Sequence, residues 1–428
     1  MYNLFKIAIR NLKRYKRRTF LTASLITIGI VFVLVFISVS GSFKSMIIGQ
    51  ITDSMLGHIQ IHKKGYVESI DNLPLTMMLQ PKTVASIRET LDKMPNIESY
   101  SMRIKFGGLL SNFVETTGIR LNGVYPEQES ATVPLLMSRI IQGEKSIKQG
   151  EVLLPELIAK GMNVKVDDTV VIIATNKDGS VNGQQFVVGG ILESVTGPGG
   201  RDGYMHIEDA MDVLRMDTSE ISEIAIRLKD FAKIDDVFNQ LDTMLLGSVN
   251  TKQKSGEVSM ADKKVENEDK PRLEIHTWEK LSPFYNIARM IDVMTFFIKL
   301  MLIAIVLVSI MNVMIMAVYE RIGEIGTIAA IGTMPGKILS MFVIEGFCLG
   351  LLGAVIGTIV GGLIIFILNL AKITFNFGRQ SGLILSPTMN IMDIVTISGI
   401  VIAISILASL QPAYKASKMN PIDALRHV

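Results

Sequence analysis

Cysteine is almost absent from this 428-residue chain, and the only one, Cys348, lies inside a long apolar run. A single cysteine cannot form an intrachain disulfide, so any domain outside that run must be held together by its buried core. Histidine is also scarce, with five residues, and the net charge is only +3. This total conceals a very uneven distribution of charge along the chain.

Charged residues are nearly missing from four long stretches. Hydrophobic residues make up 49% of the chain and the mean hydropathy is +0.39, which is high for a soluble protein. Each stretch reaches the roughly 20 apolar residues that a helix needs to cross a bilayer core about 30 Å thick. The sequence therefore predicts an integral membrane protein with four transmembrane helices, at about 20–40, 294–318, 341–370 and 391–410.

Acidic residues are absent from the first 18 positions, which carry Lys and Arg instead. The positive-inside rule then places the N-terminus in the cytoplasm, and four spans return the C-terminus there. Residues 41–290 hold 28 Lys and Arg against 34 Asp and Glu, and this topology puts them outside. A signal peptide also begins with a basic patch. However, the first apolar run is too long for one, and no A-x-A cleavage site follows, so we expect an uncleaved anchor.

Short β-type runs and helical runs, separated by Gly, Asn and Asp, fill the region between the first two spans. This order predicts an α+β domain. "KTVASIRETLDKM" (82–94) has helical spacing, and "IHTWEKLSPFYNIARMIDVM" (275–294) is expected to form an amphipathic helix leading into the second span. Residues 249–274 have almost nothing to bury and predict an exposed excursion.

The predicted organisation is as follows: an interfacial helix at 1–18, spans at 19–43, 289–318, 339–370 and 390–411, the α+β domain at 44–288, a cytoplasmic loop at 319–338, a short periplasmic loop at 371–389 and a cytoplasmic tail at 412–428.

Motifs for common chemistries are missing. "GTMPGK" (332–337) lacks the spacing, the Ser or Thr and the preceding strand of a phosphate-binding loop. His58 and His62 alternate with Ile59 and Ile61 on a predicted strand, where they would lie about 13 Å apart, too far to share a metal ion. Basic residues are not interleaved with aromatics on a presented face, and the strongest basic cluster adjoins a predicted span, which disfavours nucleic acid binding. We expect no catalytic residues, no metal and no cofactor in this chain.

Small and polar residues interrupt the apolar runs. Gly350, Gly353, Gly357 and Gly361 lie in the third run, and glycines at four-residue spacing allow close helix packing. Asn312 is expected to hydrogen-bond within the bundle. Glu345, near the cytoplasmic end of the third run, is expected at an interface rather than in a proton relay.

The segment "YERIGEIGTIAAIG" (319–332) crowds two carboxylates and an arginine between two apolar runs. Its apolar residues fall at helical spacing, which predicts a short amphipathic helix on the cytoplasmic membrane surface. Two interpretations remain open from the residues alone. The segment is either a polar loop or a handle that another protein binds.

This segment resembles the loop after the second span in permeases of the MacB and lipoprotein-releasing (LolC/LolE) ABC type, also called FtsX-like. The matching positions include Glu320, Arg321, Glu324, Ile325 and Gly326. The tail is similar to the family pattern at a second set of positions, which includes Pro412, Ala416, Ser417, Pro421, Leu425 and Arg426.

The resemblance implies a four-span permease of the bacterial inner membrane that works beside a dimer of separate cytoplasmic ATPase subunits, which would hold the ATP and Mg²⁺. The resemblance also implies that the permease would pair with a second copy or a paralogue. The loop would be the coupling helix, and ATP-driven motion would pass through it to the periplasmic domain. Membrane lipid and a periplasmic carrier or adaptor are further expected partners.

Lipoprotein release, or release of another amphiphilic substrate, is the leading functional hypothesis. The first alternative is a MacB-like exporter of peptides or antibiotics with a periplasmic adaptor. Two others are an FtsX-like regulator of a cell-wall hydrolase, which the large external domain disfavours, and a membrane sensor without ATP coupling.

Overall fold

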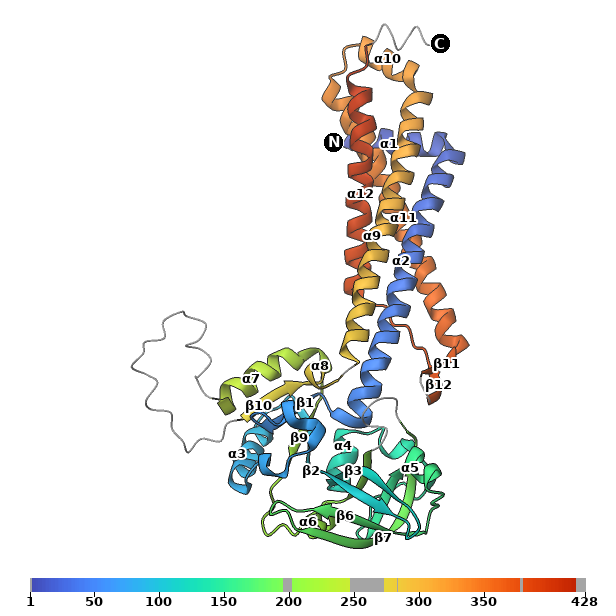
Figure 1. Ribbon diagram of the computed structural model, residues 1–428. Helices are drawn as coiled ribbons and strands as arrows, with labels where there is room; N and C mark the ends of the chain where they lie inside the picture. The colour runs from blue at the N-terminus through green and yellow to red at the C-terminus, as the bar shows by residue number, and fades with distance from the viewer. Residues whose placement is uncertain (1, 195–201, 247–272, 283, 378–379, 421–428) are drawn as a thin grey trace, which may run out of the picture. The chain divides into compact units, whose positions relative to one another are not determined.

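The computed structural model describes residues 2–194, 202–246, 273–282, 284–377 and 380–420 (Figure 1). The chain separates into two compact units. We call the first the membrane unit; it comprises Met1–Met46, Ile287–Phe375 and Gly382–Val428. The second, here the α+β unit, comprises Ile47–Asn286 and Asn376–Ser381.

Long apolar helices build the membrane unit. Its helices are α1 (Tyr2–Arg14), α2 (Lys16–Ile51), α9 (Tyr285–Glu320), α10 (Ile322–Ala330), α11 (Pro335–Ala371) and α12 (Ile391–Ser417). The two-stranded sheet of β11 (Thr374–Phe377) and β12 (Gln380–Ile384) is divided between the two units. Among the described residues, four helices are long and apolar enough to cross a membrane: Thr19–Leu56, Tyr285–Glu320, Pro335–Ala371 and Ile391–Ser417. The prediction of four spans is confirmed.

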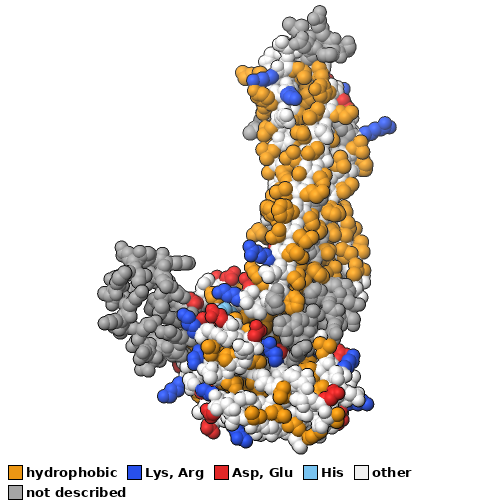
Figure 2. All heavy atoms as spheres, viewed as in Figure 1, with side chains coloured by type: hydrophobic (Ala, Val, Ile, Leu, Met, Phe, Trp, Pro, Cys, Tyr) orange, Lys and Arg blue, Asp and Glu red, His pale blue; other side chains and the backbone are white. Residues whose placement is uncertain are grey.

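Apolar side chains also form the interior of this unit. Ile26, Ile30 and Leu34 of α2 share one buried cluster with Ile310 of α9 and Phe342 of α11. Hydrophobic side chains cover the visible outer face of the same helices (Figure 2), as expected of surfaces that contact lipid rather than water.

A mixed ten-stranded sheet forms the α+β unit, in the order β10-β1-β9-β2-β3-β8-β5-β7-β4, with β6 paired to β2 and β7. The β3–β8 and β5–β7 pairs are parallel. The strands are β1 (Ile59–Lys63), β2 (Ile97–Ser111), β3 (Thr116–Val124), β4 (Ile140–Gly143), β5 (Glu151–Pro155), β6 (Thr169–Thr175), β7 (Val181–Leu192), β8 (Asp202–His206), β9 (Glu223–Leu228) and β10 (Leu273–Thr277). The helices are α3 (Pro81–Asp92), α4 (Pro126–Thr132), α5 (Glu156–Gly161), α6 (Ile207–Val213), α7 (Ile234–Leu246) and α8 (Trp278–Leu281). The predicted fold class is confirmed.

Local patterns predicted several elements correctly. The helix expected at 82–94 is α3, which starts with proline in its first turn and buries Val84, Ile87 and Leu91. The alternation around Ile59 is strand β1, but its polar face is buried too, with His62 at 0% exposure. β1 lies between β9 and β10.

The predicted helix at 275–294 is wrong at its start. Ile275 and His276 belong to β10, which pairs with β1 in antiparallel register, Ile61 opposite Ile275. The β-branched residues of this segment gain a long-range strand partner, and this pairing outweighs their helical spacing. Of the excursion expected at 249–274, all but Leu273 and Glu274 lie outside the described residues.

Candidate functional site

A buried ion pair lies at the loop between α9 and α10. Arg321 separates the two helices with φ −115° and ψ 18°, and its side chain turns inward instead of toward solvent. Its Nη1 donates to Oε2 of Glu345 on α11 at 3.2 Å, and the two side chains are only 2% and 1% exposed. The pair therefore joins the start of the loop helix to the third span.

Tyr15, at the break between α1 and α2, contacts the same loop. Its ring centroid lies 4.2 Å from Cζ of Arg321, and its hydroxyl donates to Oε1 of Glu324 at 3.3 Å. Nη1 of Arg14 lies 3.2 Å from the same carboxylate oxygen. We call these contacts of Arg14 and Tyr15 with Arg321 and Glu324 the Tyr15 contact. Elements far apart in sequence thus hold α10 from two sides.

Because the Arg321–Glu345 pair is buried, loss of either residue would lower the stability of the protein strongly. Removal of one member of a buried pair costs about 3–5 kcal/mol, because the other charge stays desolvated. A desolvated arginine over an aromatic ring contributes about 2 kcal/mol more. Within the described chain, Nε and Nη2 of Arg321 have no hydrogen-bond partner, so the guanidinium depends on Glu345 and the Tyr15 ring.

The five residues predicted for ATPase coupling divide into two groups. Glu320 and Glu324 are exposed, whereas Arg321, Ile325 and Gly326 are buried. The apolar residues expected to face the membrane also differ in exposure. Ile325 is 2% exposed and packs in the bundle, but Ile331 is 80% exposed and Met334 68%. The outward surface of the loop thus combines carboxylates with protruding apolar side chains.

The glycines of α11 lie against side chains of two neighbouring helices. A Cβ built on Gly353 would come within 2.4 Å of Ile26, and one on Gly357 within 2.8 Å of Ile30; at Gly361 the nearest atom, in Leu34, is 3.4 Å away. Gly350 faces Ser405 of α12 at 2.6 Å. Gly346, which the sequence reasoning missed, likewise faces Ser409 at 2.7 Å.

The other predicted site residues are those of the tail motif and Asn312 of α9. Pro412 and Ala416 are buried in α12, and the Ser417 hydroxyl donates to the Tyr414 carbonyl at 2.9 Å. Pro421, Leu425 and Arg426 lie outside the described residues. Asn312 is exposed on α9, and its expected hydrogen bond within the bundle stays a prediction.

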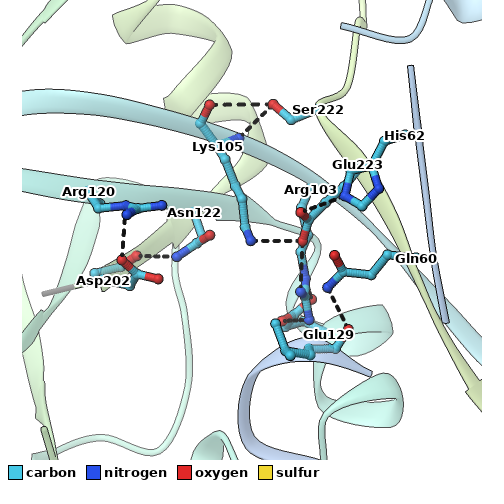
Figure 3. Close-up of polar contacts among 12 residues, drawn as sticks. Gln60, His62, Arg103, Lys105, Arg120, Asn122, Glu129, Asp202, Ser222 and Glu223 are labelled. Carbon is cyan, nitrogen blue, oxygen red and sulfur yellow. Dashed lines mark hydrogen bonds and ion pairs between the residues drawn. The ribbon is translucent and has the colours of Figure 1, made fainter. Parts of the chain in front are cut away.

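Another charged cluster lies in the α+β unit (Figure 3). Arg103 of β2 binds Glu129 of α4 through two nitrogens, at 3.0 and 2.8 Å, and Glu223 of β9 at 2.9 Å. Lys105 lies 3.0 Å and His62 3.4 Å from Glu223. Both carboxylates are fully buried, so the two acids balance Arg103 and Lys105 in the interior.

Burial and the neighbouring cations set the electrostatics of this cluster. Burial alone raises the pKa of Glu223, but Lys105, the hydrogen bond from His62 and the Arg103 guanidinium together hold it well below its usual range. Asp202 nearby has a raised pKa because of burial, despite Arg120 at 3.5 Å. No grouping of three potential metal ligands occurs among the described residues. Glu129 and Glu223 each lie within 3.0 Å of a cationic side chain, so the cluster has the character of a structural support.

Comparison with known proteins identifies the family. Residues 19–244 match the MacB-like periplasmic core domain, and residues 296–421 match the FtsX-like permease C-terminal domain. The chain therefore belongs to the ABC transporter permeases of the MacB and LolC/LolE type, and it is an integral protein of the inner membrane.

Individual relatives are distant in sequence. The chain is 22% identical to the lipoprotein-releasing system transmembrane protein LolC of Neisseria meningitidis, with 98% of each chain covered. It is 24% identical to LolC of Xylella fastidiosa strain Temecula1, with 72% of each covered. Among solved structures, the periplasmic region of MacB from Actinobacillus actinomycetemcomitans matches at 15% identity and a TM-score of 0.34, covering 54% of this chain and 94% of that one.

Proposed function

We propose that this chain transmits the ATP-driven motion of a separate cytoplasmic ATPase to its α+β unit, with both termini in the cytoplasm. The buried Arg321–Glu345 pair is the observation that supports this proposal. It links α10 to α11 through groups only 2% and 1% exposed, so α10 cannot move independently without the energetic loss of separating a desolvated pair.

The outward surface of the loop is suited to a protein partner. Ile331 and Met334 protrude beside the exposed Glu320 and Glu324. Apolar anchors with a charged rim are typical of protein interfaces. In this proposal the ATPase binds that surface, and the partner alone holds ATP and Mg²⁺. Closure of two ATPases displaces α10, and the displacement reaches α9 and α11 through Arg321 and Glu345.

Release of lipoproteins, or of another amphiphilic substrate, is the proposed task. The support is the match to LolC of Neisseria meningitidis over 98% of both chains. The permease would work with a second copy or a paralogue, and a periplasmic carrier would receive the substrate.

Export of peptides or antibiotics is the second candidate. It is supported by 32% identity to the macrolide export ATP-binding/permease protein MacB of Neisseria gonorrhoeae, which covers 33% of this chain. A periplasmic adaptor that copurifies with the chain would favour export, whereas a lipoprotein carrier would favour release.

The coupling surface can be tested by copurification of the ATPase with the Ile331→Arg variant. Ile331 is 80% exposed and Val181, on β7, is 63% exposed, so Val181→Arg is a matched control that leaves α10 intact. We expect Ile331→Arg to lose the ATPase and Val181→Arg to retain it. Equal recovery of the ATPase with both variants would refute the assignment of α10 as the coupling helix.

A further inference from the structure

Exposed positive charge gathers on α1 and the start of α2. No acidic residue precedes Asp53, and the described side chains of Lys6, Arg10, Lys13, Arg14, Lys16 and Arg17 are all exposed. Phe5 and Ile7 are 39% and 38% exposed in the same segment. A helix with cations and protruding apolar side chains fits a bilayer surface that carries anionic headgroups.

Both the charge of α1 and the way it packs fit an anionic lipid surface. Each Lys or Arg near such a surface adds to the electrostatic attraction. Leu12, on the same helix, is only 7% exposed and packs in the bundle. One side of α1 is therefore anchored in the protein, while its cations stay available to lipid headgroups.

Arg14 and Tyr15, which form the Tyr15 contact, lie within this basic segment. Arg14 and Tyr15 both reach Glu324, at 3.2 and 3.3 Å, and the Tyr15 ring covers Arg321 at 4.2 Å. The backbone bonds Tyr15 N to Asn11 O and Thr19 N to Tyr15 O continue the helical pattern through the break. The Thr19 hydroxyl also donates to the Leu12 carbonyl at 2.8 Å. Direct side-chain contacts therefore join the α1–α2 break to α10.

We propose that anionic lipid headgroups bound by α1 set the position of α10 through Tyr15, so that nucleotide turnover by the assembled transporter depends on the anionic lipid around it. This inference rests on the proposed coupling function of α10. Tyr15 is a positioning residue in this scheme, because it acts through Arg321 and Glu324 rather than on the ATPase itself.

The test uses the complex of the full chain and its copurified ATPase, reconstituted in two kinds of nanodisc. ATP turnover is measured in each and compared between the two. One contains phosphatidylcholine alone and the other phosphatidylcholine mixed with phosphatidylglycerol. We expect turnover to differ several-fold between the two discs. The triple variant Lys6→Gln, Arg10→Gln and Lys13→Gln should abolish this difference. The matched variant Lys82→Gln, Lys145→Gln and Lys165→Gln removes the same charge from exposed positions of the α+β unit and should keep both turnover and lipid response.

Tyr15 variants separate lipid binding from its transmission. Tyr15→Ala removes both the ring over Arg321 and the hydroxyl at Glu324, so the lipid response should be lost although the basic residues of α1 remain. Tyr15→Phe keeps the ring and should keep most of the response. A merely structural role of Tyr15 would lower turnover in both discs by the same factor and leave their ratio unchanged, which would overturn the inference.

Other outcomes distinguish the two proposals. If the ATPase copurifies and hydrolyses ATP equally in both discs, the lipid inference is wrong and the coupling function stands. If no ATPase copurifies, the proposed function itself fails. Glycerol phosphate added to phosphatidylcholine discs should not reproduce the response, and stimulation by this soluble anion would refute a requirement for a lipid surface.

Discussion

Replacement of Glu223 by Gln should strongly destabilise the α+β unit. Glu223 is fully buried and lies 2.9 Å from Arg103 and 3.0 Å from Lys105. The change removes one of two negative charges that balance two positive ones, so the interior retains an uncompensated cation. Breaking a buried charged network in this way costs about 3–5 kcal/mol. That is a large fraction of the roughly 5–15 kcal/mol that stabilises a typical domain.

The chain contains its own reporter for this measurement. Its only tryptophan, Trp278, lies in the α+β unit at 3% exposure. Urea unfolding of the detergent-solubilised chain, followed by Trp278 fluorescence, therefore reports on that unit. Glu89→Gln is the control, because Glu89 forms an exposed pair with Lys93 at 2.7 Å, and such surface pairs contribute little.

Two results would refute this reasoning about Glu223. The first is an unfolding midpoint for Glu223→Gln that is no lower than that of Glu89→Gln. The second is an additional loss of stability when Lys105→Met is combined with Glu223→Gln. The combination restores charge balance in the interior, so we expect it to recover part of the lost stability.

Acid should reduce the difference between wild type and Glu223→Gln. The pKa of Glu223 is lowered in the folded protein, whereas in the unfolded chain it is near the ordinary value of about 4.3. A lowered folded pKa stabilises the protein above the unfolded value, and the stabilisation is lost as the pH falls through the folded pKa. The stability difference between the two proteins should therefore be constant near neutrality and shrink below about pH 4.3.

Helix packing and topology give the remaining predictions. Gly357→Ala should lower the thermal stability of the detergent-solubilised chain, because the new Cβ would lie 2.8 Å from Ile30; Gly399→Ala, which has no atom within 4 Å, should not. Equal effects of the two changes would contradict the packing argument. Replacing the sole cysteine, Cys348, by Ala permits single-cysteine labelling at Ile331 or Val181. In intact spheroplasts an impermeant maleimide should reach a cysteine at 181 and not one at 331, and the reverse pattern would invert the proposed topology.

Local patterns predicted much of the fold. Apolar runs located the four spans, helical spacing located α3, and alternation located β1, because in each case the signal comes from neighbours in sequence. Strand β10 was not found, since its residues become a strand only by pairing with β1 more than 200 positions earlier. Burial of His62 depends in the same way on β9 and β10.

The candidate site was predicted in part. The composition of the loop at 319–332 singled out Glu320, Arg321 and Glu324, but not which of them face solvent. Glu345 was expected at an interface without a named partner, and that partner is Arg321. The role of Tyr15 could not be read from sequence, because it lies 306 positions from Arg321. An aromatic residue within a run of basic ones was the only available signal.

The pairing of β1 with β10 has a consequence for how such permeases diversify. These strands are the first and last of the ten-stranded sheet in chain order, and they are neighbours in antiparallel register, Ile59 opposite Thr277. The chain therefore leaves this unit beside the point where it enters. Domains whose ends lie close together tolerate transplantation. Two cuts flanking this strand pair would exchange one α+β unit for another while the four spans stay unchanged.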